Sequence, residues 1–160
     1  MTALMQAVQK NDVAAVKKLI AQGVNVNELE SSGDAPLVMS AYEGHTEITR
    51  LLLEAGADVK AVDPDMQATA LHAAAYAGRA SDAKLLIEHH IDINKQGPRN
   101  GYTALHDAIW QNNVDVARLL IDSGANLTLK NHSGQTPLDF AKAKHATQII
   151  AMIEAKLGKT

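Results

Sequence analysis

The 160-residue sequence predicts an all-α fold, an α-solenoid of five stacked helix-turn-helix repeats joined by β-hairpin-like loops. Three sets of positions recur along the chain with a common period, which indicates a repeat architecture. A core leucine recurs every 33 or 34 residues, at Leu4, Leu37, Leu71, Leu105 and Leu138. A turn residue follows each leucine by seven positions, at Asn11, Gly44, Gly78, Asn112 and His145. The third set ends the second helix of a repeat, at Gly23, Gly56, His90 and Gly124.

The first helix of each repeat is predicted from its start signals and its apolar face. Thr69 and Thr103 are good N-caps, and Pro36 and Pro137 suit the first helical position. Apolar residues then follow at positions i, i+3 and i+4, which lie on one face of a helix. Equivalent faces are formed by Leu4, Ala7 and Val8, by Leu71, Ala74 and Ala75, and by Leu105, Ala108 and Ile109.

The second helix of each repeat is predicted from segments such as Thr46–Gly56 and Val114–Gly124. Their terminal glycine can adopt the left-handed conformation of a helix C-cap. His90 is expected to take this role in the third repeat, under modest strain. Short alternating segments follow (VNVN, ADVK, IDIN and ANLT) and lead to turn glycines, which predicts hairpin-like loops.

Because the repeats follow one another along the chain, residues 1–160 are predicted to form a single domain. The predicted repeats cover about residues 1–29, 30–62, 63–96, 97–130 and 131–160. A helix pair of this size cannot bury its apolar face alone, so the repeats should stack around one continuous core. Terminal repeats of such an array need a polar outer face. Lysines in the first and last repeats therefore indicate that these two are caps: Lys17, Lys18, Lys142 and Lys144.

The pattern resembles the ankyrin repeat, whose period and T-P-L-H-x-A signature it shares. The most similar segments are GYTALHDA at Gly101–Ala108, SGQTPLDFA at Ser133–Ala141 and EGHTEITRLLLEAGADV at Glu43–Val59. The resemblance extends over essentially the whole chain. It implies a rigid scaffold that binds other proteins through a concave groove and the tips of its hairpin loops.

The chain departs from the family pattern at several positions. Val38 and Asp139 stand where the family often has histidine. Asp82 stands where the matching repeats have Ile48 and Val116, a position that should pack toward a neighbouring repeat. An unpaired buried aspartate would be strongly destabilising. We therefore expect the segment around Asp82 to be locally shifted, or its side chain to be partly solvated.

Three of the five aromatic residues form a periodic set. Tyr42, Tyr76 and Trp110 recur at intervals of 34 residues, each five positions after a core leucine. That offset is about 140° around a helix, so the rings should point away from the core face. Tyr and Trp are enriched at interaction hot spots, which predicts that these rings anchor a partner. Alternatively, the rings pack against the hairpins or Met66 and only cover the small residues of the helices.

The resemblance places these three positions on the concave surface, with the hairpin tips beside them. The partner-binding residues that it implies are Tyr42, Glu43, Met66, Tyr76, Arg99, Tyr102, Trp110, Gln111, Lys130 and His132, with Asp34 and Asp65 at further variable positions. The predicted function is non-catalytic protein–protein interaction, as an adaptor or an inhibitor. One alternative is binding of a small anionic ligand in the groove by Arg99, Lys130 and His132. Another is an enzyme accessory protein that self-associates as a structural element.

The remaining polar candidates are assigned structural roles by the same resemblance. His72 and His106 occupy the T-A-L-H position, which implies hydrogen bonds to backbone and to neighbouring loops. Asn27 and Asn94 end the NVN and DIN segments, which implies that their side chains stabilise the hairpins. We therefore predict no catalytic residue, no metal site and no cofactor.

Composition argues against several other classes. The chain has no cysteine, which excludes disulfides and thiolate catalysis. A net charge of −3 without a basic stripe argues against nucleic-acid binding, and no apolar run is long enough to cross a membrane. The N-terminus lacks a signal-peptide pattern. The expected localisation is cytoplasmic, or periplasmic or secreted if a leader was removed, and the chain is expected to be a monomer when unbound.

Overall fold

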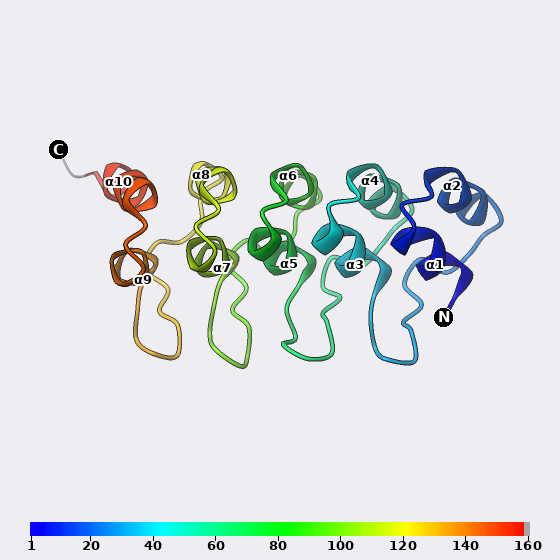
Figure 1. Cartoon of the computed structure of the whole chain (residues 1–160), viewed down its shortest axis with the longest axis horizontal. Coiled ribbons are helices and arrows are strands. Elements are labelled where there is room, and N and C mark those ends of the chain that lie inside the picture. The colour runs from blue at the N-terminus through cyan, green and yellow to red at the C-terminus, as the bar shows by residue number, and fades with distance from the viewer. Residues whose placement is uncertain (159–160) are drawn as a thin grey trace.

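Ten helices lie in two parallel rows within residues 1–158, the part of the chain described by the computed structural model (Figure 1). The row beside the hairpin loops contains α1 (Ala3–Gln9), α3 (Pro36–Glu43), α5 (Ala70–Ala77), α7 (Ala104–Trp110) and α9 (Pro137–Ala143). The second row contains α2 (Val13–Ala21), α4 (Thr46–Glu54), α6 (Ala80–Glu88), α8 (Val114–Asp122) and α10 (Thr147–Lys156). The prediction of an all-α solenoid is confirmed.

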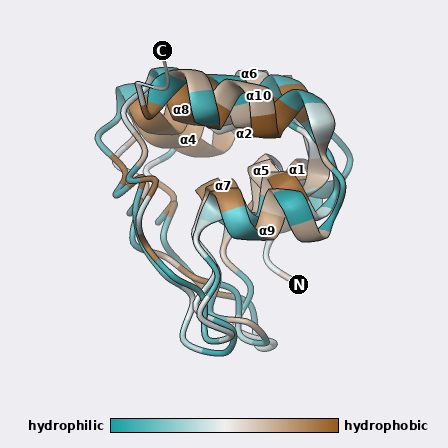
Figure 2. Ribbon diagram, turned by 90° about the vertical axis from the view of Figure 1, so that its left-hand side faces the viewer, coloured by the Kyte–Doolittle hydropathy of each residue, from teal (hydrophilic) through white to brown (hydrophobic). Residues whose placement is uncertain are grey.

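The loops between successive helix pairs project away from both rows, as the view along the stack shows (Figure 2). They have the shape of hairpins, but their only β pairing within residues 1–158 is one antiparallel bridge between Val62 and Thr69. Each repeat is thus two antiparallel helices and a projecting loop. From the second pair onward, the first helix and the loop before it form an inner corner, which repeats along the molecule.

Side-chain caps start most of the inner helices. The hydroxyl oxygens of Thr69 and Thr103 accept the N–H groups of His72 and His106, and the two imidazoles accept the threonine N–H groups in return. Asp139 completes the same reciprocal box with Thr136. Thr69 and Thr103 are the predicted N-caps, and α3 differs because its cap residue is an alanine followed by Pro36. A proline at the first helical position has no free N–H that requires a partner.

The predicted turn positions have positive φ angles. Between the helices of a pair, φ is 54° at Asn11, 75° at Gly44 and 58° at His145. At the end of the second helix it is 92° at Gly56 and 66° at His90. The role predicted for His90 is therefore confirmed. The left-handed conformation lets the chain leave each helix sharply enough to begin the next element.

The core lies between the two rows of helices and runs through all five pairs. Each pair contributes a buried leucine or aromatic residue from its inner helix and aliphatic residues from its outer helix. Alanines such as Ala74, Ala75 and Ala108 are fully buried where neighbouring inner helices are close together. The hydropathy colouring shows brown surfaces of both rows turned toward this interior (Figure 2).

Asp82 is neither shifted nor solvated, so both alternatives predicted for it are wrong. It lies within a regular α6 and is 1% exposed. Thr46 Oγ1 of α4 donates a hydrogen bond of 2.6 Å to Asp82 Oδ1, and Thr49 Oγ1 donates one of 2.6 Å to Asp82 Oδ2. The aspartate is tolerated because the preceding repeat offers two hydroxyl groups at the position where it packs.

Polar side chains also connect successive repeats, as predicted. His72 Nε2 is 3.0 Å from the Tyr102 carbonyl oxygen, and His106 Nε2 is 3.1 Å from that of Gln135. The Asn27 side chain bonds Gly56 and Asp58, and Asn94 Oδ1 accepts the N–H of Asn126. Each of these four residues therefore fixes a hairpin to the next repeat along the stack.

Candidate functional site

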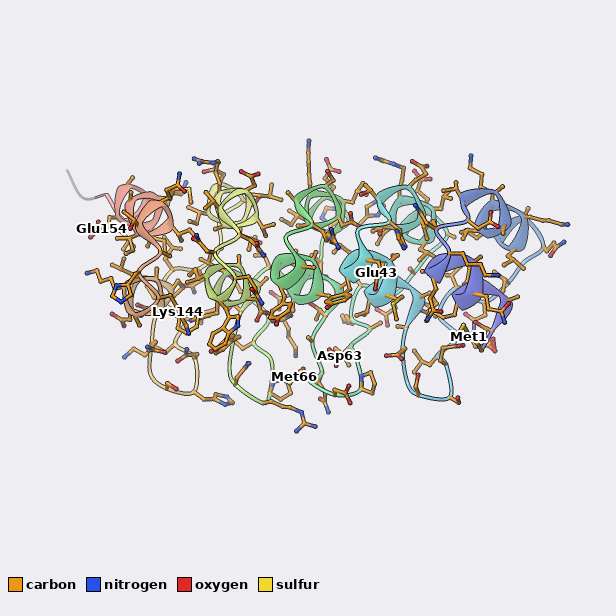
Figure 3. All side chains as sticks on the ribbon, in the orientation of Figure 1. Met1, Glu43, Asp63, Met66, Lys144 and Glu154 are labelled. Atoms are coloured by element: carbon orange, nitrogen blue, oxygen red, sulfur yellow. The ribbon has the colours of Figure 1, made fainter. Side chains whose placement is uncertain are left out.

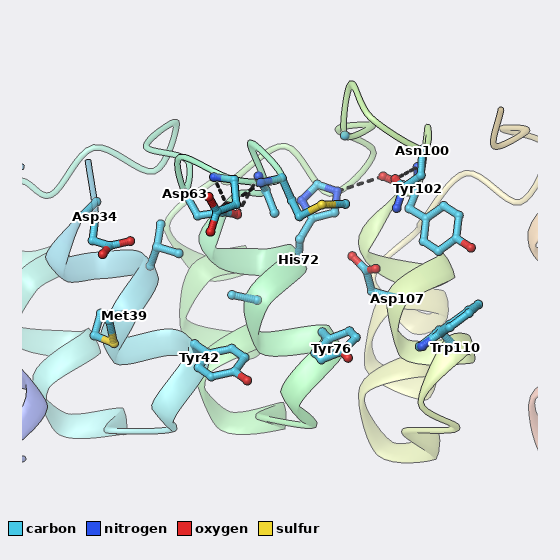
Figure 4. A pocket seen from close by; sticks show the side chains of 17 residues that line it. Asp34, Met39, Tyr42, Asp63, His72, Tyr76, Asn100, Tyr102, Asp107 and Trp110 are labelled. Carbon is cyan, nitrogen blue, oxygen red and sulfur yellow. Dashed lines mark hydrogen bonds between the residues drawn. The ribbon is translucent and has the colours of Figure 1, made fainter. Parts of the chain in front are cut away.

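A groove of about 660 Å³ lies over α3, α5 and α7, in the corner between these helices and the hairpin loops (Figure 4). Its volume is within the range of known ligand-binding clefts. Tyr42, Tyr76 and Trp110 follow one another along its helical wall. Met66 and Asn100 come from the loops that form the opposite wall.

Most of the lining comes from three equivalent positions in consecutive repeats. Relative to the core leucine, these are the residues three before it, two after it and five after it. The first set is Asp34, Ala68 and Tyr102; the second is Met39, Ala73 and Asp107; the third is Tyr42, Tyr76 and Trp110. The second and third sets are three residues apart on a helix and thus share one surface. Because the helices stack in register, each set becomes a row across the groove.

The three predicted anchor rings are partly open to solvent. Tyr42 is 46% exposed, Tyr76 is 43% exposed and Trp110 is 47% exposed. Met66 is also 44% exposed at the hairpin. Large apolar side chains that remain this exposed in neighbouring repeats form a contiguous apolar surface, which is a feature of interaction sites.

Trp110 differs from the two tyrosines because one of its faces is covered. It stacks on Phe140 with ring centroids 6.1 Å apart, and its ring lies 6.4 Å from that of Tyr102. Lys144 Nζ lies 3.6 Å from the Trp110 ring centroid. These contacts to Phe140 and Lys144 come mainly from the next repeat, rather than from the hairpins or Met66, and Trp110 also lines the groove.

The polar part of the lining is acidic, with four aspartates and no lysine or arginine. Asp63 already accepts N–H groups of Asp65, Met66 and Ala68, which shapes the hairpin. Asp34 accepts the Ser32 hydroxyl group. Asp107 has no hydrogen-bond or ion-pair partner within residues 1–158, and burial raises its pKa to about 8.

His72 also borders the groove but both of its ring nitrogens are engaged. Nδ1 lies 2.9 Å from Thr69 Oγ1, and Nε2 contacts the Tyr102 carbonyl oxygen. Burial lowers its pKa below the ordinary value of 6.5. The imidazole is therefore a neutral structural element rather than a free acid or base. No group of three His, Cys, Asp or Glu residues within residues 1–158 is placed to hold a metal ion.

Half of the predicted binding residues lie outside the lining of the groove. Glu43 is exposed at the end of α3 (Figure 3), and Gln111 is exposed at the C-cap of α7. Lys130 and His132 are exposed in the loop before α9, beyond the last repeat that the groove contacts. Arg99 is exposed and its Nε donates to the Asp65 carbonyl oxygen, which joins two hairpin tips. These five residues flank the groove.

Sequence reasoning did not select Met39, Ala73 and Asp107. Their signal was available, because each lies three residues before one of the periodic rings and therefore on the same helical surface. Ala73 matters through its small size. Its methyl group is shorter than the side chains of Met39 and Asp107 on either side, so the groove is deeper at this point.

None of the helices in the part of the chain that the structure describes combines the length and the apolar character required to cross a membrane. A family model described as "Ankyrin repeats (3 copies)" matches residues 4–97 and 61–131. Together these matches extend over most of the chain and include every helix that lines the groove.

Three curated proteins show the range of relatives. The chain is 35% identical over 71 residues to Palmitoyltransferase Hip14 of Drosophila melanogaster, and 37% identical over 60 residues to Ankyrin repeat domain-containing protein 49 of Bos taurus. It is 39% identical over 65 residues to Protein phosphatase 1 regulatory subunit 27 of Homo sapiens. These alignments cover 44%, 37% and 41% of this chain and only 11%, 25% and 42% of the relatives.

Proposed function

The chain belongs to the ankyrin-repeat family, and we propose that it is a non-catalytic binding module that holds a segment of a partner protein in the groove over α3, α5 and α7. Ankyrin repeats are protein-interaction modules. The proposal assigns direct contact to the lining residues Tyr42, Met66, Tyr76, Tyr102 and Trp110. The flanking residues Glu43, Arg99, Gln111, Lys130 and His132 would contact parts of the partner that extend beyond the groove.

One observation carries this proposal. Tyr42, Tyr76 and Trp110 remain 43–47% exposed although each comes from a helix packed within the stack. The Tyr and Trp side chains offer large areas for burial at little cost in conformational entropy. The groove is also preformed by helices and bonded hairpins, so little ordering would be needed on binding.

A regulatory role is supported by one relative. The human relative is named as a regulatory subunit of protein phosphatase 1, and it resembles this chain over 41% of the length of the chain. A module of this kind would act as an adaptor or as an inhibitor that covers part of an enzyme. The palmitoyltransferase resembles this chain over only 11% of its own length, which gives no support for acyl transfer here.

The groove gives no support to a small anionic ligand. Its lining contains Asp34, Asp63, Asp65 and Asp107 and lacks basic side chains. Arg99, Lys130 and His132, which were considered for that role, lie outside the lining. A negative potential would repel an anion and favour a cationic or apolar occupant.

Affinity capture with groove variants tests the proposal. The immobilised wild type and the Tyr76→Ala/Trp110→Ala variant are exposed to the same lysate, and bound proteins are quantified by mass spectrometry. We expect at least one protein to be retained by the wild type and depleted tenfold or more on the double variant.

The matched control is Leu29→Ala, which removes an exposed apolar side chain (54% exposed) outside the groove. It should retain the same proteins as the wild type. Thermal unfolding of each variant shows whether the fold is intact. Equal capture by the wild type and a folded double variant would contradict the proposed use of the groove.

A further inference from the structure

We propose that the partner segment inserts a lysine or arginine side chain between Tyr76 and Trp110, where its charged group pairs with the Asp107 carboxylate. This inference rests on the proposed function and names the chemistry of the occupant. Figure 4 shows Asp107 among the rings of Tyr76, Tyr102 and Trp110, at the end of the groove formed by α7.

The first argument is the state of Asp107. Its equivalents in the two preceding repeats are Met39 and Ala73, so the fold does not require a carboxylate there. The side chain is half-buried and unpaired within residues 1–158, unlike Asp82, which receives two hydroxyl hydrogen bonds. Partial burial disfavours the charged form of an acid that has no partner, which raises the pKa of Asp107 in the free protein. A cation supplied by the ligand would stabilise the charged form.

The second argument is the orientation of Trp110. Its face toward α9 already has the Lys144 ammonium 3.6 Å from the ring centroid and Phe140 stacked behind. The face toward α5 borders the groove beside Asp107. An aromatic face next to a carboxylate attracts a cation by two effects at once, the ring quadrupole and the negative charge.

Charge complementarity decides between a basic and a purely apolar segment. Four aspartates and no lysine or arginine line the groove. Three of them, Asp34, Asp63 and Asp65, come from the loops, and the fourth is Asp107 of α7. Apolar residues such as Met39, Met66 and Tyr42 accompany them. The occupant that fits is a mixed segment, apolar at the rings of Tyr42 and Met66 and basic at Asp107.

The proposal predicts how affinity depends on pH. The titratable and charged groups around Asp107 are His72 and Tyr76 of α5, Tyr102 before α7, Asp63 of the hairpin and Lys144 beyond Trp110. With the pKa of Asp107 raised to about 8, the free protein holds a proton there at neutral pH. Binding of a cation must release this proton, so affinity should rise with pH and level off above about 8. The largest possible effect is tenfold per pH unit.

The experiment begins with a displayed library of random peptides selected on the wild type. Peptides that bind the wild type but not the Tyr76→Ala/Trp110→Ala variant are sequenced. We expect one position in these peptides to be strongly enriched in lysine or arginine. A synthetic peptide is then compared with its norleucine analogue, which keeps the aliphatic length and removes the charge.

Binding is measured by the fluorescence of Trp110, the single tryptophan of the chain. We expect norleucine to weaken binding to the wild type at least tenfold, and to have little effect on Asp107→Asn. The control variant Asp122→Asn makes the same replacement of a carboxyl group by an amide at the exposed end of α8 and should behave as the wild type. The Kd should fall between pH 6 and pH 8.

The outcomes separate this inference from the function on which it rests. Groove-dependent peptides without a basic position, or an equal norleucine effect on Asp107→Asn, would overturn the cation site and leave the binding function intact. An affinity that decreases as pH rises would also overturn it, since it would indicate a protonated Asp107 that donates to a carbonyl group. Absence of any groove-dependent peptide would count against the proposed function itself.

Discussion

Two aspartates on the helices of neighbouring repeats have opposite environments. Asp82 of α6 is fully buried, and the hydroxyl groups of Thr46 and Thr49 donate to both of its carboxylate oxygens. Asp107 of α7 is half-buried and has no such donors within residues 1–158. At the scale of single residues, the number of donors distinguishes an acid that belongs to the fold from one that is available to a ligand.

The Asp82→Ala variant should lower the free energy of unfolding by about 2–4 kcal/mol, because it removes two charge-assisted hydrogen bonds from a buried site. Urea denaturation monitored by circular dichroism measures this loss. The neighbouring interface supplies a control, since Val116 of α8 there stands at the position equivalent to Asp82, and Ala80 and Ala83 of α6 stand at the positions equivalent to Thr46 and Thr49. The triple variant Thr46→Ala/Thr49→Ala/Asp82→Val copies that arrangement and should recover most of the stability. Failure of the triple variant to recover would show that the polar group has a further role.

The sequence could predict that a polar residue occupies a core position, but it could not predict which residues form hydrogen bonds with it. A polar residue at a core position of α6 is visible from the repeat alignment, but the two threonines that satisfy it lie 33 and 36 positions earlier. Pairing across repeats depends on how far one repeat is translated against the next. That displacement is a property of the stack, so reading Asp82 by itself led to a wrong expectation of a shift or of solvation.

At the scale of helices and loops, one position per repeat sets the exit from the outer helix. Glycine occupies it at Gly23, Gly56 and Gly124, and His90 occupies it in the third repeat with φ at 66°. Only glycine adopts this conformation without steric cost from a Cβ atom. His90 is exposed, so its side chain compensates little by packing.

We therefore expect His90→Gly to raise the free energy of unfolding by about 0.5–1 kcal/mol, which is the steric relief minus the extra chain entropy of glycine. Thermal unfolding should show a higher Tm. The reverse change, Gly124→His, places the same residue at the equivalent cap, where an added Cβ atom meets nothing within 4 Å. It should lower stability by a similar amount. Equal stabilities for both variants and the wild type would argue against backbone strain at His90.

Helix positions and caps were predictable for a clear reason. Each follows from local chemistry, such as threonine or proline at a helix start and a residue that tolerates positive φ at a helix end. The groove was predictable only in part. The periodic rings pointed to its helical wall, whereas Arg99, Lys130 and His132 were selected by loop position alone and lie outside the lining. Loop side chains depend on contacts such as that between Arg99 and the Asp65 carbonyl group, which no local pattern encodes.

At the scale of the whole molecule, stability depends on bonds that join one repeat to the next. His72 and His106 lie at two successive junctions and are almost fully buried. Burial lowers the pKa of both imidazoles below the ordinary 6.5. In the unfolded chain these histidines gain a proton near pH 6.5, while in the folded protein they resist it. Stability should therefore be highest above pH 6.5 and decrease as pH falls through and below that value.

Asp107 has the opposite dependence on pH. Its pKa in the folded protein, about 8, exceeds the ordinary 3.8. Its contribution to the free energy of unfolding is therefore complete below pH 3.8 and is lost as pH rises toward 8. Between pH 5 and pH 7.5 the two effects partly cancel in the wild type. The Asp107→Asn variant removes the carboxyl group and leaves the histidines to be observed alone.

In the Asp107→Asn background, the free energy of unfolding should decrease between pH 7.5 and pH 5, with a slope of up to about 1.4 kcal/mol per pH unit for each histidine. Urea denaturation at several pH values measures this slope. Adding His72→Gln and His106→Gln keeps neutral polar groups at both junctions and removes the titration, so the slope should become much smaller even if overall stability falls. The same slope with and without the two histidines would assign the acid sensitivity to other groups. A smaller slope would place it at the junctions, where burial opposes the charged imidazole and where a proton on Nδ1 prevents that atom from accepting the Thr69 or Thr103 N–H group.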